Sequence, residues 1–231
     1  MNDIIVTSKN KIYTLDDSDP MVKKHLNDPT SYARTIMKEI NFDRLYDKFF
    51  RDKNDLVILD IGANVGLFTI YAHDSSKRIV AVEPTESHQY IFKQLTKSIK
   101  DLVLDTCALS DSDDMIKFYM CEDNTTMNSI VNTYEKYTEV QGLTLKSLMD
   151  RHGLDYVDLC KIDIEGSEMK AITKDTLDAV KNRVRNIYIE IHDTPGSSQS
   201  ENMLKMNMLF KECGYETNIV DSRTIFARRI V

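Results

Sequence analysis

A short apolar run that ends in a glycine-rich turn constrains the fold of this chain more than any other stretch. Residues 57–61 are apolar except for Asp60, the turn Gly62–Gly66 follows, and residues 67–71 have the apolar spacing of a helix. An apolar run without polar alternation predicts a strand buried on both faces. Strand, turn and helix make the first half of a βαβ unit, whose ligands bind beyond the carboxyl ends of the strands.

The turn contains the residue types that a tight ligand-binding loop requires. We expect Gly62 to turn where a Cβ atom would collide, Asn64 to adopt a left-handed conformation, and Gly66 to allow close contact between helix and strand. The turn lacks the Gly-Lys-Ser/Thr sequence of a phosphate loop, and Asn64 breaks the Gly-x-Gly-x-x-Gly fingerprint of dinucleotide folds. The alternative interpretation is a tight turn between core elements that binds no ligand.

The remaining pattern, Asp60-x-Gly62-x-Asn64-x-Gly66, resembles the first motif of class I methyltransferases that use S-adenosylmethionine (AdoMet). AdoMet has no pyrophosphate, so the loop need only admit an amino-acid tail and a ribose. The resemblance implies that these four residues belong to a cofactor-binding loop.

Composition and charge narrow the class of protein. A chain of 231 residues predicts one domain, with or without an extension. A formal net charge of −7 disfavours a nucleic-acid partner, because affinity there depends largely on phosphate neutralisation. The four scattered cysteines lack metal-ligand spacing and indicate a reducing compartment. The N-terminus lacks the regions of a signal peptide and no apolar run could cross a bilayer, so we predict a cytoplasmic protein.

Residues 1–54 precede the βαβ unit and are predicted to form a small N-terminal extension. It is too short to hold a core of its own, so we expect it to pack over the end of the sheet that binds the cofactor. Its predicted elements are a hairpin (4–6 and 11–15), a loop (16–29), and a helix from Thr30 or Ser31 to about Phe50.

From residue 55 to 231, strand-like runs alternate with helical patterns. Such a series forms an open, mostly parallel sheet with helices on both faces. The last two strand-like runs flank a polar turn and predict an antiparallel terminal hairpin. We therefore predict an α/β domain of the Rossmann-like type. Further predicted strands are 78–82, 102–106, 115–120, 157–162, 186–191, 215–220 and 224–228, and predicted helices are 86–99, 145–151, 167–173 and 201–213.

An acid follows the second strand of this series. Glu83 lies roughly 20 residues beyond the glycine turn, where this architecture binds the two hydroxyl groups of a ribose. A carboxylate can accept hydrogen bonds from both hydroxyls with charge assistance. The alternative is a solvated acid before a proline turn. Cys107 and Ala108 follow the third strand and would lie beside the adenine, although a core contact explains them equally well.

Two later strands also end in groups that could carry chemistry. Asp163 follows one strand, and Glu190 and His192 end the next. If the strands are neighbours, these side chains meet on the ligand side of the sheet, where Asp163 or His192 could accept a proton. Lys161 could compensate the charge of Asp163. Glu165 and Glu168 could belong to the same ligand-side group. Alternatively, they are acids in the first turn of the following helix, where the helix dipole favours negative charge.

Six segments together resemble the FkbM family of AdoMet-dependent methyltransferases, and they occur in the family's order. The resemblance covers roughly residues 56–215 and leaves residues 1–54 unmatched. It implies transfer of a methyl group from AdoMet to a hydroxyl, often on a sugar or a polyketide-like product. The matching segments are Asp60–Gly66, Val82–Pro84, Ala108–Ser110, Leu143–Leu145, Lys161–Gly166 and Ile189–His192.

Three functions therefore compete. The leading one is an AdoMet-dependent O-methyltransferase acting on a small-molecule or glycan hydroxyl. Asp163, Glu190 and His192 would be its catalytic group, or the ligands of a divalent metal. The second is a non-catalytic Rossmann-like module that binds a nucleoside. The third, a nicotinamide-dependent oxidoreductase, is disfavoured by the broken glycine fingerprint and by the absence of a Tyr-x-x-x-Lys pair. The sequence leaves the acceptor and the oligomeric state open.

Overall fold

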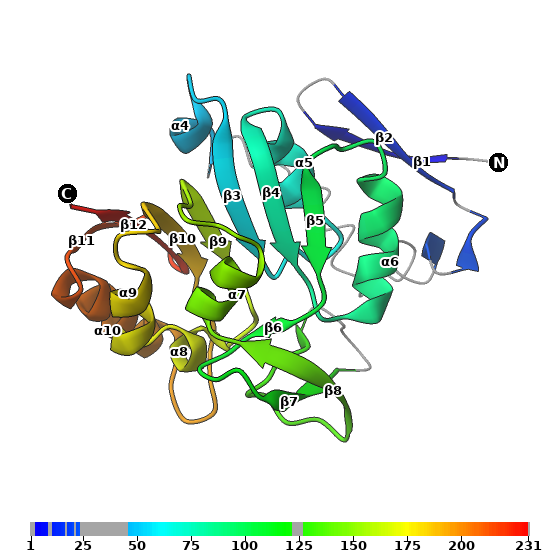
Figure 1. Cartoon of the computed structure of the whole chain (residues 1–231). Helices are drawn as coiled ribbons and strands as arrows, with labels where there is room; N and C mark the ends of the chain where they lie inside the picture. Colours follow the sequence, from blue (N-terminus) through cyan, green and yellow to red (C-terminus); the bar gives the residue numbers. More distant parts are fainter. Residues whose placement is uncertain are drawn as a thin grey trace.

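The protein is built around one twisted sheet. The computed structural model describes residues 3–8, 11–16, 18–20, 22–23, 46–121 and 127–230. In this part of the chain the large sheet has the strand order β11-β12-β10-β9-β3-β4-β5 (Figure 1). Neighbouring strands from β10 to β5 run parallel, and β12 pairs antiparallel with both β10 and β11. The strands are β3 (Leu56–Ile61), β4 (Ser76–Val82), β5 (Leu102–Asp105), β9 (Leu159–Ile162), β10 (Asn186–Glu190), β11 (Tyr215–Ile219) and β12 (Thr224–Arg229).

Helices cover both faces of this sheet, as the sequence predicted. Side chains alternate along β3, so that Ile58 packs with one layer of helices and Leu59 and Ile61 with the other. The first layer holds α4 (Asp47–Phe50), α5 (Leu67–His73) and α6 (Glu86–Leu95), and the second holds α7 (Leu145–Arg151), α8 (Glu168–Ala171), α9 (Lys174–Val180) and α10 (Gln199–Glu212). Among the described residues, no helix combines the length and the apolar character that crossing a membrane requires.

Local signals explain where several helices begin. Thr144 and Thr173 cap α7 and α9 by accepting from the backbone N–H three residues later. Ser198 and Glu201 form a capping box at the start of α10. The predicted single helix over 167–173 is wrong in extent. The chain instead forms the short α8, is capped again at Thr173, and continues as α9, which the sequence analysis did not predict.

Other predicted boundaries shift by a few residues. The helix predicted over 86–99 ends at Leu95, where the Thr96 hydroxyl donates to the carbonyl oxygen of Phe92. The strand predicted from residue 157 begins at Leu159. The C-terminal antiparallel hairpin is confirmed, with Asn218 opposite Phe226.

A smaller sheet stands beside the carboxyl ends of β4 and β5 (Figure 1). It contains β6 (Ala108–Leu109), β7 (Met115–Met120) and β8 (Lys136–Leu143). The strand over 115–120 was predicted, but its pairing with a long β8 was not. This sheet matters for the site because it brings Phe118 toward the carboxyl edge of the large sheet.

The described part of the N-terminal extension packs beside the domain. β1 (Asp3–Ser8) and β2 (Lys11–Asp16) form the predicted antiparallel hairpin, and β2 contacts α6. Most of the predicted loop and helix over 16–50 lies outside the described residues, and α4 falls within the range predicted for that helix. No described residue before 55 lines the ligand cavity, so a cover formed by this extension stays a prediction.

Candidate functional site

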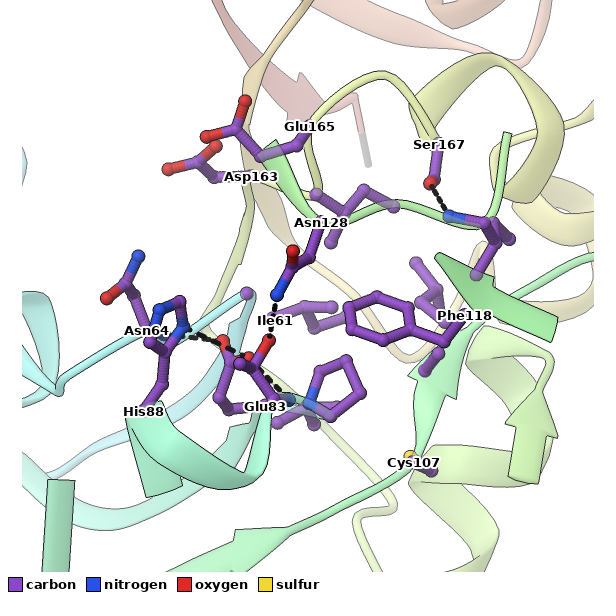
Figure 2. Close-up of a pocket in the computed structure, with 18 residues that line it drawn as sticks. Ile61, Asn64, Glu83, His88, Cys107, Phe118, Asn128, Asp163, Glu165 and Ser167 are labelled. Atoms are coloured by element: carbon purple, nitrogen blue, oxygen red, sulfur yellow. Dashed lines mark hydrogen bonds and ion pairs between the residues drawn. The ribbon is translucent and has the colours of Figure 1, made fainter. Parts of the chain in front are cut away.

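A cavity opens at the carboxyl ends of β3, β4 and β9, the edge where the sequence predicted a ligand. The space among its lining residues, including the part open to solvent, is about 550 Å³. Figure 2 shows Glu83 and Asn64 on one side, Asp163 and Glu165 on another, and the Phe118 ring between the strand ends and the small sheet. Parts of the chain far apart in sequence therefore meet around one space.

The glycine turn has the strained backbone that was expected of it. Gly62, Asn64 and Gly66 all have positive φ angles, of 74°, 50° and 90°. A Cβ atom on Gly62 would lie 1.7 Å from the carbonyl oxygen of Asp163, so the turn and the loop after β9 touch through bare backbone. The close contact at Gly66 differs from the prediction, because its neighbour is the Phe92 ring of α6 rather than the preceding strand.

Asp60 lies beneath the turn rather than in the cavity. Its carboxylate is fully buried and accepts a hydrogen bond of 2.6 Å from the Thr69 hydroxyl of α5. Its second oxygen lies 3.7 Å from the Lys161 ammonium. Burial raises the pKa of Asp60, and the nearby Lys161 opposes that rise. The structure thus places this predicted ligand residue where it anchors the turn.

Glu83 lines the cavity with a carboxylate that is already held in position. Oε2 accepts from the Asn64 N–H and Oε1 from the Thr85 N–H, each at 2.8 Å. Burial acts to raise the pKa of Glu83, but the nearby His88 imidazole, whose Nδ1 lies 3.5 Å from Oε1, and the Thr85 N–H hold it below its usual value. An ionised carboxylate therefore faces the cavity, and each oxygen can accept further hydrogen bonds.

An apolar wall stands next to Glu83. Cys107 and Ala108 line the cavity as predicted, and Leu109, Phe118 and Ile130 extend the same wall. Burial raises the pKa of the Cys107 thiol, so this side chain acts as a neutral apolar group. The contribution of the small sheet to this wall had no signal in the sequence analysis.

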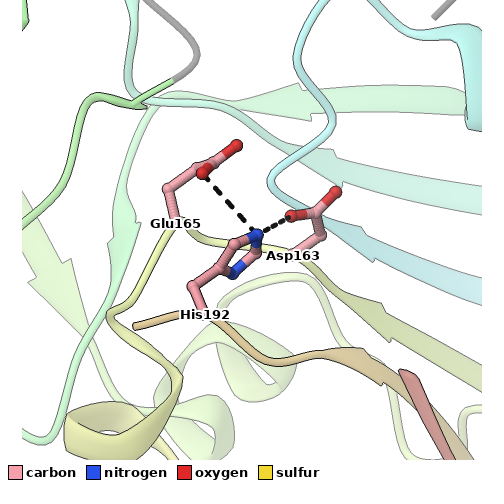
Figure 3. A group of neighbouring side chains, drawn as sticks. All are labelled: Asp163, Glu165 and His192. Carbon is pink, nitrogen blue, oxygen red and sulfur yellow. Dashed lines mark ion pairs between the residues drawn. The ribbon is translucent and has the colours of Figure 1, made fainter. Parts of the chain in front are cut away.

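A cluster of carboxylates surrounds His192 at the ends of β9 and β10 (Figure 3). Its Nε2 atom lies 3.8 Å from Asp163 Oδ1, 3.6 Å from Glu165 Oε2 and 3.7 Å from Glu190 Oε1. Because β9 and β10 are neighbours in the sheet, the three residues predicted as catalytic do come together. Glu165, for which a first-turn acid was the alternative, joins them and lines the cavity.

Lys161 connects this cluster to the glycine turn. Its ammonium donates to the carbonyl oxygen of Gly62 at 2.9 Å and lies 3.3 Å from Asp163 Oδ2. Burial acts to raise the pKa of Asp163, but Lys161 and then His192 hold it below its usual value. The predicted pairing of Lys161 with Asp163 is confirmed, and it keeps Asp163 ionised.

Glu168 is the main site residue that the sequence interpretation missed. It is fully buried, and its Oε1 accepts from the Ile164 and Gly166 N–H groups and from His192 Nδ1, the last at 3.0 Å. The carboxylate thus turns back from the first residue of α8 to the preceding loop. Because Nδ1–H donates to Glu168, the ring is oriented with Nε2 facing the other carboxylates.

The carboxylates of the cluster compete for protons and for the charge of His192. Burial acts to lower the pKa of His192, but Glu168, Asp163 and Glu165 raise it to about 10. Burial and the nearby Asp163 raise the pKa of Glu165 to about 8 and that of Glu190 to about 7. At neutral pH the ring is an imidazolium among competing carboxylates, an arrangement that favours a further positive charge nearby.

A family model and two curated relatives match this chain. The model described as "Methyltransferase FkbM domain" matches residues 60–217, which include both sides of the cavity. "Methyltransferase 1" of Beauveria bassiana is 28% identical over 188 residues, covering 70% of this chain and 74% of that protein. The AMB antimetabolite synthetase AmbE of Pseudomonas aeruginosa is 24% identical over 229 residues, covering 80% of this chain. This chain spans only 11% of that synthetase's length.

Solved structures support the same fold. The Methanococcus jannaschii fibrillarin pre-rRNA processing protein matches with a TM-score of 0.51 and 9% identity, over 99% of this chain and 82% of that one. A precorrin 8w decarboxylase from Methanobacterium thermoautotrophicum matches with a TM-score of 0.50 and 8% identity, over 83% of this chain and 90% of that one. At such low identity the likeness concerns the fold alone, and it confirms the predicted class I methyltransferase architecture.

Proposed function

This chain belongs to the FkbM methyltransferase family, and on that premise we propose that it transfers the methyl group of AdoMet to a hydroxyl of a sugar or glycan. The observation that carries the proposal is a single cavity with the ionised carboxylate of Glu83 on one side and two members of the acid–histidine cluster, Asp163 and Glu165, on another. A module that only binds a nucleoside, the second candidate, has no need of that cluster.

The cavity fits AdoMet at three points. The Glu83 carboxylate would accept from the two ribose hydroxyls, and the apolar wall around Cys107 and Phe118 would contact the adenine. The turn at Gly62 and Asn64 would hold the amino-acid tail, because both residues line the cavity. AdoMet supplies a methyl group on a positively charged sulfur, which the negative cluster would favour electrostatically.

Methyl transfer to a hydroxyl requires that the protein position the hydroxyl and accept its proton. The acceptor oxygen gains the methyl carbon as the carbon–sulfur bond breaks, and the hydroxyl proton needs a base. His192 is already protonated at neutral pH, so in the ligand-free site it orients rather than accepts. We assign the base to the carboxylates. Glu165 lines the cavity, and its pKa of about 8 leaves a larger deprotonated fraction at neutral pH than the pKa of about 10 leaves for His192, whereas the lowered pKa of Asp163 makes that residue a weaker base.

A metal-assisted version of the reaction would use the same cluster. Asp163, Glu165 and His192 each offer a ligand atom, and these atoms lie within 4.8 Å of one another. The hydrogen bond from His192 Nδ1–H to Glu168 is the outer contact that metal-binding histidines commonly have. A bound Mg²⁺ or Mn²⁺ supplies a Lewis acid that lowers the pKa of a hydroxyl. From the sequence, Glu190 rather than Glu165 was the expected third ligand.

A labelling experiment tests the proposed function. The full chain would be incubated with AdoMet carrying a labelled methyl group and with glycans and small sugars from its host, before and after EDTA. We expect label in a product that resists mild alkali, as a methyl ether does. Activity lost to EDTA and restored by Mg²⁺ favours the metal-assisted version. Label released by mild alkali would indicate a methyl ester and contradict O-methylation of a hydroxyl.

A cytoplasmic location and the absence of a nucleic-acid partner stay predictions. The four cysteines are free, which supports a reducing compartment. The carboxylate cluster beside the cavity disfavours a phosphate backbone as acceptor, because like charges would meet there.

A further inference from the structure

A second cavity extends over the face of the large sheet that packs with α4, and it reaches the amino ends of three strands. Leu56 begins β3, Asp158 precedes β9 and Asn186 begins β10, and all three line this space. These are the amino ends of parallel strands, whereas the first cavity stands at their carboxyl ends. The space, including the part open to solvent, is about 1710 Å³.

The register of the sheet gives this cavity an aromatic wall with an arginine beside it. Tyr188 of β10 lies opposite Phe226 of β12, and Asn186 lies opposite Arg228, so these four side chains share one face. The rings of Tyr188 and Phe226 have centroids 6.2 Å apart, and Phe49 of α4 lies 6.0 Å from Phe226. All of these residues line the cavity.

Positive charge gathers around this wall in a chain whose formal net charge is −7. The cavity is lined by four basic residues and two acidic ones, namely Lys48, Lys53, Arg185, Arg228, Asp52 and Asp158. Asp158 Oδ2 already accepts from the Val57 N–H at 2.9 Å. Within the described residues no ion pair holds Arg185 or Arg228, although Glu216 lies opposite Arg228 on β11.

Two further observations indicate that the basic residues lining this cavity lack a counter-charge. The Lys53 ammonium lies 3.4 Å from the centre of the Phe49 ring. Burial lowers the pKa of Lys53, and Arg228 and Arg185 lower it further, so three cations act on one another. An anion beside Lys53 would relieve this repulsion.

We propose that this second cavity binds a small phosphate monoester with an aromatic body. Arg185 and Arg228 would hold the phosphate, because guanidinium groups match its oxygens with paired donors. The aromatic body would lie against Phe226, whose partly exposed ring offers apolar surface on the same strand as Arg228. A dianionic phosphate balances the crowded cations better than a single carboxylate does. The proposal does not depend on the methyl-transfer function.

Calorimetry on the full chain with phenyl phosphate, at constant ionic strength, tests this site. We expect wild-type protein to bind phenyl phosphate and the R185Q/R228Q variant to bind it at least ~10-fold more weakly. The matched control is K181Q/K211Q, which removes the same charge at exposed lysines after α9 and within α10. The control should bind as wild type does. Thermal melts check that each variant is folded.

Three further binding measurements distinguish specific binding at this site from nonspecific attraction of anions. We expect R228K, which keeps the charge but loses the paired donors, to weaken binding as well. F226L should weaken phenyl phosphate more than it weakens inorganic phosphate. Benzoate should bind more weakly than phenyl phosphate. The proposal is overturned if wild-type protein shows no binding at about millimolar phenyl phosphate, if R185Q/R228Q binds like wild type, or if benzoate binds equally well.

Discussion

At the scale of single residues, Glu83 has the most direct test. We expect Glu83→Gln to weaken AdoMet binding roughly 10–100-fold, because charge-assisted hydrogen bonds to the ribose would become neutral ones. The amide oxygen can still accept from one of the two N–H groups that Glu83 now satisfies. Calorimetry measures the affinity, with Glu86→Gln at an exposed position of α6 as the matched control. Equal affinity of Glu83→Gln and wild type would exclude Glu83 from the cofactor site.

Glu168 acts through His192, so its test is a property of that ring. We expect Glu168→Gln to lower the pKa of His192 from about 10 toward its ordinary value, because the buried counter-charge at Nδ1 is removed. The amide nitrogen would replace Oε2, which has no hydrogen bond in the described structure. An NMR titration of the imidazole measures the shift, and Glu212→Gln on α10 serves as a surface control. A His192 pKa unchanged by the substitution would contradict this positioning role.

The proposed base predicts how methyl transfer depends on pH. Glu165 must be deprotonated to accept a proton, so we expect kcat to rise with pH through about 8. Glu165→Gln should lower kcat by at least ~10²-fold and remove this rise, while AdoMet affinity stays within a few-fold. Rate–pH profiles of the two proteins measure the effect. If the rise near pH 8 persists in Glu165→Gln, another group titrates there.

At the scale of elements, the contact between the β3–α5 turn and the loop after β9 decides whether the site forms. We expect Gly62→Ala to abolish AdoMet binding and to lower the melting temperature, because its Cβ atom would lie 1.7 Å from the Asp163 carbonyl oxygen. The matched control is Gly196→Ala, which has a similarly positive φ but no atom within 4 Å of the added Cβ. That control should cost only the left-handed backbone strain, about 1–2 kcal/mol. Equal effects of the two substitutions would show that the contact is unimportant.

At the scale of the whole molecule, the carboxylate cluster links folding to pH. Glu165 and His192 have raised pKa values, so the folded state holds protons that the unfolded chain releases between about 4.5 and 8 and between about 6.5 and 10. Stability of the ligand-free protein should therefore fall as pH rises from about 5 to 10. Thermal melts across this range measure the trend. We expect Glu165→Gln/Glu190→Gln to flatten it, and an equally steep fall in this variant would contradict the assignment.

Much of the fold was predictable because its signals are local. The unbroken apolar run before Gly62 specifies a buried strand, and the positive φ angles at Gly62, Asn64 and Gly66 follow from residue types within five positions of one another. The terminal hairpin was predictable for the same reason. Where local signals compete, as at the Thr173 cap that begins a second helix, the prediction failed.

The sequence by itself determined which chemical groups follow each strand, among them Glu83 after β4 and Asp163 after β9. Only the tertiary structure decided which of these groups meet. The strand order puts β9 between β3 and β10, which joins Lys161 to the glycine turn and surrounds His192 with carboxylates. The tertiary structure also decided that Asp60 is buried and that the Glu168 carboxylate accepts hydrogen bonds from the loop before α8. Such contacts depend on packing between distant segments, whereas a sequence pattern reports only the preferences of neighbouring residues.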